Sequence, residues 1–282
     1  MRNFRIIILL MLALSVSAFA QDKIKFEDFK LKSKLMNREM PYRVLLPSNY
    51  DKQKDSRFPV VYLLHGLFGH FNLWTEKTKL AEHATKHQII IVNPEGDNGW
   101  YSDSVSNPND RYETYITEEL IPQIDKNFRT FSDRKNRFMG GLSMGGYGSL
   151  KFGLKYPEKF ALVGSFSGAL GAASIVLDEK NQMLGKSIMN IFGEINSQTR
   201  KDNDIFLLAK NISTDKVKEL PFIYLDCGTE DFLFQNNRDF ANILVDKKIP
   251  HEFRQLPGKH DWKFWDSQVQ EFLQLAEQLS KK

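Results

Sequence analysis

The sequence has little of what marks several specialised classes of protein. It holds one cysteine, Cys227, so no disulfide can form within the chain. The apolar run around Cys227 indicates a small buried side chain in a strand, with a catalytic thiol as the alternative. The 17 glycines and 10 prolines among 282 residues are ordinary amounts, which excludes collagen-like and low-complexity chains. A formal net charge of +4 is too small to favour nucleic acid or an anionic surface as a partner.

Long apolar runs are missing as well, except near the start, so we expect no integral membrane segment in the rest of the chain. Residues 1–20 have the layout of a signal peptide. Arg2 and Arg5 precede an apolar run over 6–16 that is short for a membrane span, and Ala18-Phe19-Ala20 forms a cleavage site. The alternative, an uncleaved N-terminal anchor, leaves that cleavage site unexplained. We therefore expect export, to the periplasm or out of the cell, after cleavage near Ala20.

The remaining residues, 21–282, are expected to form a single α/β domain. Two strand-like runs at 26–36 and 41–47, separated by the turn-like Asn37-Arg38-Glu39, predict an antiparallel hairpin at its start. Apolar strands then alternate with helices. The strands are expected at 59–64, 88–92, 137–139, 160–166, 221–227 and 251–256, and the helices at 74–87, 112–128, 147–156, 231–247 and 261–279. This alternation is typical of a doubly wound, mostly parallel sheet.

Two segments depart from the simple pattern. Residues 167–220 lack the alternation and are expected to form a mainly helical excursion over the sheet. Pro122 falls within the helix expected at 112–128, where we expect its ring and its missing N–H to kink or break the helix.

The segment Gly141-Leu142-Ser143-Met144-Gly145 is a G-x-S-x-G sequence between an expected strand and an expected helix. This order is that of a nucleophile elbow, where small flanking residues let the backbone turn sharply and leave the serine oxygen exposed. An ordinary glycine-rich turn with a solvated serine is the alternative. A serine hydroxyl is a weak nucleophile, so Ser143 needs a general base and an acid that orients the base.

His260 is the expected base, because it alone follows the last strand and precedes the final helix. The other histidines have structural interpretations: His65 and His70 lie near the first buried strand, His83 and His87 are four apart on a helix face expected to be solvated, and His251 begins a strand. For the acid, Asp226, Glu230 and Asp231 are candidates, and helix capping is the alternative role for each. We favour Asp231, at the junction of loop and helix.

Acyl transfer also needs backbone donors for the oxyanion that forms on the substrate. One expected donor is the amide of Met144, directly after the nucleophile at a helix N-terminus. The other is the amide of Leu67, in the loop His65-Gly66-Leu67-Phe68-Gly69, where glycine allows close approach of the backbone. We expect His65 to brace this loop rather than to act as a base.

Aromatic residues near the expected site are candidates for contact with substrate. Trp100 and Tyr101 lie in the loop 93–110 on the active-site side, and with Trp262 they are expected to wall an acyl or sugar group. The alternative is that Trp100 and Tyr101 pack the loop. The acidic residues of this loop lack the spacing of a calcium site, so we assign no metal, and the chemistry needs no cofactor.

The motifs together resemble the esterase D-like family of α/β-hydrolases over about residues 40–280. They are Tyr62-Leu-Leu-His-Gly-Leu67, Tyr112-Glu-Thr-Tyr115 followed by Glu119-Leu-Ile-Pro122 and Ile124-Asp125, Gly141-Leu-Ser-Met-Gly-Gly146, Cys227-Gly-Thr-Glu-Asp231, and Gly258-Lys-His-Asp-Trp262 with Trp265. The family includes S-formylglutathione hydrolases, feruloyl, acetylxylan and tributyrin esterases, and mycolyltransferases. The resemblance implies an α/β-hydrolase fold, a triad of Ser143, Asp231 and His260, and an oxyanion hole from the Leu67 and Met144 amides.

The resemblance also implies a serine carboxylesterase acting on short-chain acyl or carbohydrate-linked esters, such as acetyl or feruloyl esters. The expected signal peptide argues against the cytoplasmic role of the members that cleave glutathione thioesters. Two alternatives stay open: an acyltransferase that moves the acyl group to a sugar or glycerol alcohol, and a catalytically silent binding protein on the same scaffold.

Overall fold

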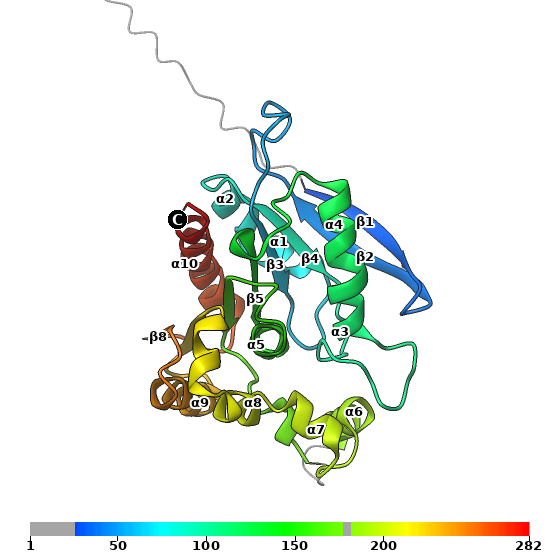
Figure 1. Cartoon of the computed structure of the whole chain (residues 1–282), viewed down its shortest axis with the longest axis vertical. Coiled ribbons are helices and arrows are strands. Elements are labelled where there is room, and N and C mark those ends of the chain that lie inside the picture. The colour runs from blue at the N-terminus through cyan, green and yellow to red at the C-terminus, as the bar shows by residue number, and fades with distance from the viewer. Residues whose placement is uncertain (1–25, 177–181, 282) are drawn as a thin grey trace, which may run out of the picture.

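The computed structural model describes residues 26–176 and 182–281 (Figure 1). The signal peptide expected at 1–20 lies outside the described residues. No helix in the described part of the chain is long and apolar enough to cross a bilayer.

The described residues form one sheet of eight strands with the order β1-β2-β4-β3-β5-β6-β7-β8. The strands are β1 (Phe26–Ser33), β2 (Arg38–Leu45), β3 (Val60–Leu64), β4 (Ile90–Pro94), β5 (Arg137–Leu142), β6 (Leu162–Phe166), β7 (Phe222–Gly228) and β8 (His251–Leu256). β1 pairs antiparallel with β2, and β2 pairs antiparallel with β4. All pairs from β4 to β8 are parallel. The predicted mostly parallel sheet, opened by an antiparallel hairpin, is confirmed.

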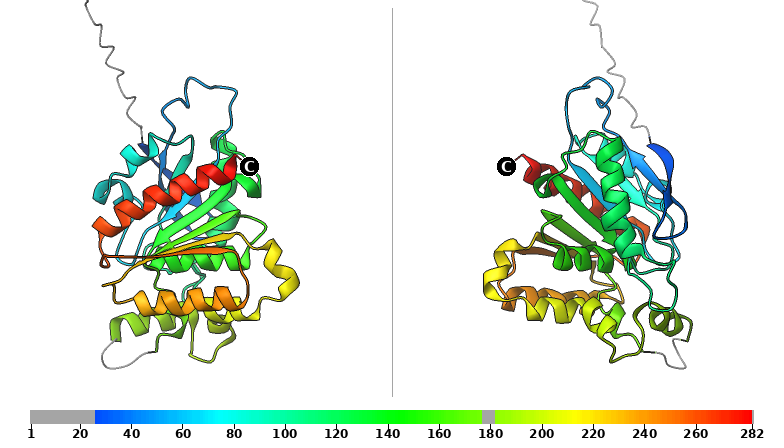
Figure 2. Two further views of the ribbon diagram at one scale, coloured as in Figure 1. Left: turned by 90° about the vertical axis from the view of Figure 1, so that its left-hand side faces the viewer. Right: turned by 45° about the vertical axis from the view of Figure 1, so that its right-hand side comes forward.

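Helices cover both faces of the sheet, and each face has its own apolar core (Figures 1 and 2). One face carries α1 (Leu73–Lys77), α2 (Leu80–Ala84) and α10 (Trp262–Ser280). The other carries α3 (Tyr112–Thr114), α4 (Ile121–Asn127), α5 (Met144–Lys155), α8 (Ile205–Asn211) and α9 (Phe234–Asp246). The strands β3 to β6 are buried on both sides, which explains their continuous apolar sequences.

The region 167–220 contains α6 (Gln182–Phe192), α7 (Gln198–Asn203) and α8, with short 3₁₀ turns before and after them. The expected helical excursion is thus present in the described part of this region. This region packs against α5. Near the N-terminus of α5, the Tyr147 hydroxyl donates to the Asn203 carbonyl over 2.7 Å.

The helix expected at 74–87 is two short helices, because Thr78 between them has extended backbone (φ −133°, ψ 174°). Side chains cap the start of the second helix: Thr78 Oγ1 accepts from the Leu80 amide, and Asp266 of α10 accepts from the Lys79 amide. His83 of α2 and His87, three residues beyond its end, do not form a solvated face either. His83 contacts Asp266, and His87 contacts Glu277, both on α10.

We expected Pro122 to kink or break its helix, and the helix is not broken there. Residues Tyr115–Leu120 form a π-helical segment that joins α3 to α4 without interruption. In its wider turn the Ile121 amide donates to the Ile116 carbonyl, five residues back. Pro122 then falls in the first turn of α4, where the missing N–H and the ring are tolerated.

The hairpin turn lies at 34–37, earlier than the expected Asn37-Arg38-Glu39. Its position depends on a distant residue: the carboxylate of Glu119 accepts hydrogen bonds from the amides of Lys34 and Leu35. Asn37 ends the turn with a positive φ of 50°.

A buried ion pair ties the helices to the loop that follows β4. The Lys151 ammonium, fully buried on α5, lies 2.7 Å from Glu113 Oε2 and 2.8 Å from the Tyr101 carbonyl. Glu113 also contacts Lys155 and accepts from the Tyr156 hydroxyl. Burial alone would raise the pKa of Glu113, but the two ammonium groups outweigh it and lower that pKa to about 2.

We expect Glu113→Gln to lower the free energy of unfolding by about 3 kcal/mol, because it leaves the Lys151 charge buried without its carboxylate. Urea unfolding at neutral pH measures this. Glu219→Gln is the matched control, since Glu219 pairs with Lys216 on an exposed turn. This substitution should leave the free energy of unfolding unchanged within error. Equal effects of the two substitutions would contradict the role given to Glu113.

Candidate active site

Ser143 sits on a sharp turn between β5 and α5. Its backbone is left-handed, with φ at 53° and ψ at −114°, a conformation that a residue with a side chain rarely adopts. The turn is held by hydrogen bonds: the Ser143 amide donates to the Phe166 carbonyl, and the Ser143 carbonyl accepts from the amides of Tyr147 and Ala169.

Glycine is required on either side of this turn. A Cβ at Gly141 would lie 2.5 Å from the Gly145 carbonyl, and one at Gly145 would lie 2.6 Å from the Leu64 carbonyl oxygen. Neither clash can be relieved by a flexible side chain, because the atoms that would be met belong to the backbone. The G-x-S-x-G sequence therefore reflects the packing of the turn, and the half-buried serine projects from it.

Three of the predicted site residues form one hydrogen-bonded line. His260 Nε2 lies 3.1 Å from Ser143 Oγ, and His260 Nδ1 lies 2.9 Å from Asp231 Oδ2. The three side chains come from the turns after β5, β7 and β8, whose carboxyl ends meet at one edge of the parallel sheet.

The carboxylate of Asp231 is suited to orient the imidazole. Burial alone would raise its pKa, but hydrogen bonds from His260 and from the Leu233 amide hold the pKa below its usual value. Asp231 therefore stays ionised where an imidazole titrates, and it keeps a proton on Nδ1 of His260. Nε2 is then free to accept the proton of the Ser143 hydroxyl.

The other candidates for the acid and the nucleophile lie elsewhere. Asp226 is buried inside β7, and burial raises the pKa of its carboxyl well above the usual value. Glu230 is exposed and pairs with Lys259 at 3.6 Å. Burial also raises the pKa of the Cys227 thiol to about 12, which leaves it inert as a nucleophile.

Met144, whose amide is one expected oxyanion donor, follows Ser143 directly, and Leu67, which carries the other, follows Gly66 in the loop after β3. A Cβ on Gly66 would lie 3.4 Å from the Ser143 Cβ, so the loop after β3 is pressed against the serine. Within the described residues the amides of Leu67 and Met144 donate no hydrogen bond, whereas the Phe68 amide donates to Asn98 Oδ1 over 2.8 Å. Two backbone donors are therefore available near the nucleophile.

His65 and Glu95 brace the loop that carries Leu67. The buried His65 ring lies 2.8 Å from the Gly66 carbonyl through Nδ1 and 3.1 Å from Glu95 Oε1 through Nε2, which also accepts from the Gly96 amide. Glu95 also accepts from the amides of Phe71 and Asp97, which belong to the loops after β3 and β4. One carboxylate thus joins the two loops. This role of Glu95 could not be predicted from the sequence, because many surface carboxylates also follow a strand.

Burial alone would raise the pKa of Glu95, but the contact with His65 and the backbone donors lower it to about 2. His70, Glu95 and Asp97 place ligand atoms within 4.8 Å of one another, the arrangement of a small metal site. Both Glu95 oxygens are already occupied by hydrogen bonds, so we assign this cluster no metal.

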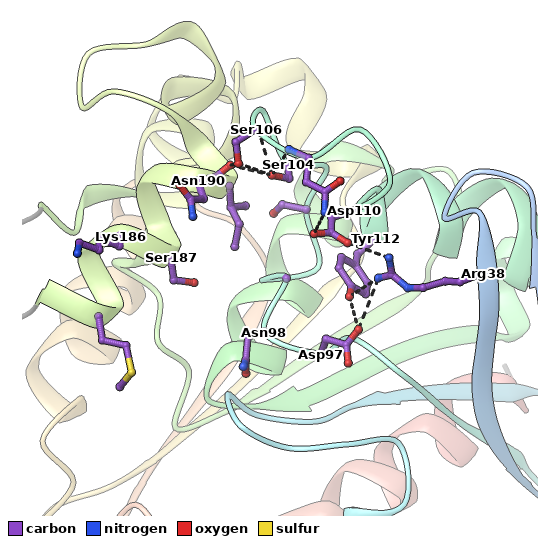
Figure 3. A pocket seen from close by; sticks show the side chains of 15 residues that line it. Arg38, Asp97, Asn98, Ser104, Ser106, Asp110, Tyr112, Lys186, Ser187 and Asn190 are labelled. Atoms are coloured by element: carbon purple, nitrogen blue, oxygen red, sulfur yellow. Dashed lines mark hydrogen bonds and ion pairs between the residues drawn. The ribbon is translucent and has the colours of Figure 1, made fainter.

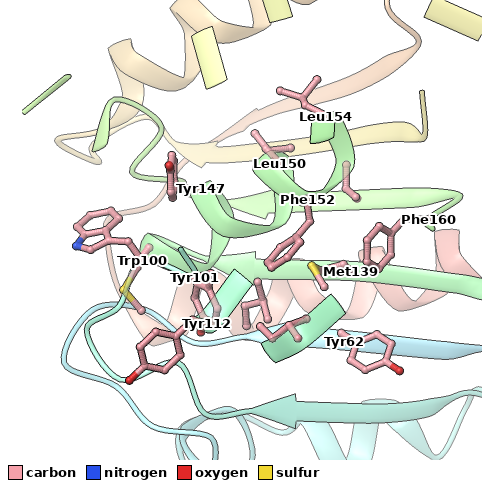
Figure 4. Packing of buried hydrophobic residues seen from close by; sticks show 14 of the residues in the cluster. Tyr62, Trp100, Tyr101, Tyr112, Met139, Tyr147, Leu150, Phe152, Leu154 and Phe160 are labelled. Atoms are coloured by element: carbon pink, nitrogen blue, oxygen red, sulfur yellow. The ribbon is translucent and has the colours of Figure 1, made fainter. Parts of the chain in front are cut away.

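The expectation that Trp100 and Tyr101 wall the substrate is corrected by their burial. Trp100 is 2% exposed and Tyr101 0%, and both lie in the apolar core with Tyr147 (Figure 4). The Tyr101 hydroxyl donates to the His65 carbonyl over 3.0 Å, so these side chains pack the loop. Trp262 packs edge-on against Trp74 and Trp265.

Two phenylalanines that the motifs did not single out lie exposed at the site. Phe68 follows Leu67, has a positive φ of 61° and is 66% exposed. Phe232 follows Asp231, is 78% exposed, and its ring centroid lies 4.7 Å from that of His260. The two rings offer apolar surface next to Leu67 and His260. The sequence could have indicated both residues, because each directly follows a predicted site residue.

The sheet and the Ser-His-Asp line define the class of a serine hydrolase with the α/β-hydrolase fold. Comparison with known families narrows this class. The Esterase family model, described as "Putative esterase", matches residues 33–275, and the chain belongs to this family.

Individual relatives agree with the family. An acetyl esterase from Caldicellulosiruptor saccharolyticus is 31% identical over 247 residues, which cover 84% of this chain and 92% of that protein. A ferulic acid esterase structure matches with a TM-score of 0.77 and 26% identity, covering 91% of this chain and 98% of the other. An S-formylglutathione hydrolase from Staphylococcus aureus matches with a TM-score of 0.76 and 25% identity, covering 90% and 98%. The protein is a carboxylic ester hydrolase.

We expect stability at acidic pH to reveal the bracing role of Glu95. Its pKa is lowered from 4.5 to about 2 on folding, so its contribution is present above pH 4.5 and is lost as the pH falls toward 2. Between about pH 5 and about pH 3 this loss amounts to about 2 kcal/mol. In Glu95→Gln the free energy of unfolding should therefore fall less steeply over this interval. Urea unfolding at the two pH values measures the difference, and equal slopes would refute it.

Proposed function

We propose that this chain is an exported serine carboxylesterase that hydrolyses short-chain acyl or carbohydrate-linked esters through a covalent acyl-enzyme. The observation that carries the proposal is the line from Ser143 through His260 to Asp231, with donor–acceptor distances of 3.1 Å and 2.9 Å. The distances match those needed for proton transfer between a nucleophile and its base.

In the first half of the reaction Ser143 Oγ attacks the ester carbonyl carbon while His260 Nε2 takes the hydroxyl proton. The carbonyl oxygen becomes an oxyanion, which accepts hydrogen bonds from the amides of Leu67 and Met144. Collapse of this intermediate breaks the bond to the alcohol, and His260 returns the proton to the departing oxygen. Asp231 stabilises the imidazolium formed in between.

In the second half a water molecule attacks the acyl-enzyme. His260 again takes the proton, the same two amides hold the oxyanion, and the carboxylic acid leaves as Ser143 Oγ is protonated. The enzyme returns to its starting state. The exposed rings of Phe68 and Phe232 offer apolar contact to the acyl or alcohol group.

The substrate class rests on the relatives and on the first residues of the chain. One relative is named an acetyl esterase and one structural neighbour a ferulic acid esterase, which supports short acyl groups and carbohydrate-linked esters. The layout of residues 1–20 supports export, with the mature chain beginning near Gln21. Export favours an extracytoplasmic ester over a glutathione thioester.

We expect Ser143→Ala to lower kcat/KM for p-nitrophenyl acetate at least about 10³-fold, because no other group in the site forms the acyl-enzyme. Initial rates with the mature protein measure this. Ser280→Ala is the matched control, a half-buried serine at the far end of α10, and its rate should equal that of the parent. A Ser143→Ala protein that keeps the parent rate would rule out the mechanism.

A further inference from the structure

A large polar hollow lies beside the site, between the loop that follows β4 and the helix α6. Its volume is about 740 Å³, within the range of small-molecule binding pockets. Arg38, Asp97, Asp110 and Tyr112 form one wall, and Ser187 and Asn190 of α6 lie on the opposite wall (Figure 3). We call it the α6 pocket.

The α6 pocket is connected to the catalytic serine through a short stretch of backbone. Asn98 lines the pocket, and its Oδ1 accepts from the Phe68 amide over 2.8 Å. Phe68 is two residues from Gly66, which packs against Ser143, and two residues span at most about 7 Å. The pocket therefore lies near Ser143, with Phe68 between the two.

The charges of the lining balance. Two cations, Arg38 and Lys186, face two anions, Asp97 and Asp110, and Arg38 already contacts Asp110 at 2.9 Å and Asp97 at 3.6 Å. Lys186 is exposed on α6 and makes no ion pair with another described residue, so the lining holds one unpaired charge, at its edge. The lining suits a ligand without net charge.

The remaining lining is rich in groups that both donate and accept hydrogen bonds. It contains Ser104, Ser106, Ser187, Asn98, Asn107 and Asn190, while Ser102 is buried and bonded to Lys151. The hydroxyls of Ser104 and Ser106 donate to the Asn190 carbonyl and can still accept from a ligand. Met183, which is 73% exposed, adds an apolar surface at the rim. Hydroxyls, amides and an isolated apolar contact match a sugar, whose hydroxyl edges are polar and whose ring faces carry C–H groups.

We propose that the α6 pocket binds the carbohydrate half of the substrate, as a short neutral oligosaccharide whose esterified hydroxyl reaches Ser143. The inference deepens the proposed function, in which such a sugar is the alcohol released from the ester. It assigns substrate selection to α6 and to the loop after β4, and bond cleavage to Ser143 and its partners.

Calorimetric titration with an unesterified sugar tests the pocket without needing catalysis. The titrated protein is the full mature chain carrying Ser143→Ala, and the probes are xylotetraose and maltotetraose. We expect saturable binding of at least one of them. Ser187→Trp, which fills the hollow from α6, should weaken that binding at least about tenfold, which corresponds to 1.4 kcal/mol.

A second variant and a control guard against misfolding. Asn190→Ala removes an exposed amide and should weaken binding about threefold, as expected for one lost hydrogen bond. Ser280→Trp introduces the same bulk into a half-buried helical serine on α10 and should leave binding unchanged.

The possible results separate the two proposals. Binding that Ser187→Trp and Asn190→Ala weaken supports the α6 pocket, whatever esters the protein hydrolyses. If neither sugar binds, or if both variants bind as well as the Ser143→Ala parent, the pocket is refuted even when p-nitrophenyl acetate is hydrolysed. Sugar binding by a protein without any Ser143-dependent hydrolysis would refute the proposed function and leave the pocket standing.

Discussion

The left-handed backbone of Ser143 is the constraint on which the rest of the site depends. A φ of 53° is costly for a residue with a side chain, so the surrounding structure has to hold it. The hydrogen bond to Phe166 and the close packing of Gly141 and Gly145 against neighbouring backbone do this. Both depend on β5 lying between β3 and β6, in the middle of the parallel sheet. The fold thereby fixes the nucleophile to within the distance that proton transfer to His260 requires.

Two buried carboxylates hold the loops around the serine in place. Glu95 joins the loop that carries Leu67 to the loop after β4, and Glu113, through Lys151, anchors the same second loop to α5. Both carboxyl groups have a pKa of about 2, because the cations and amides around them outweigh the cost of burial. Loops are usually the mobile part of a fold, and here the loops beside the nucleophile are tied down from two directions. Such rigidity is what preorganised oxyanion donors need, since they must be in place before charge develops.

Much of this could be predicted from local sequence. Continuous apolar strands revealed the parallel sheet, and chain order placed Ser143, Asp231 and His260 at one edge of it. The features that we predicted wrongly depend on contacts between residues far apart in the sequence. Asp266 binds the chain next to the break at Thr78, and Glu119 binds the hairpin turn. The burial of Trp100 and the exposure of Phe68 and Phe232 could not be read from residue type, because aromatic residues serve cores and binding sites alike.

Covalent labelling can show whether Ser143 is a nucleophile activated by His260. A fluorophosphonate phosphonylates an activated serine oxygen and releases fluoride, and mass spectrometry of the digested protein locates the adduct. We expect one adduct, on the peptide that contains Ser143, and labelling at least about 10²-fold slower in His260→Ala, whose serine has lost its base. An adduct on another residue, the absence of any adduct, or labelling at the parent rate without His260 would contradict this role of Ser143.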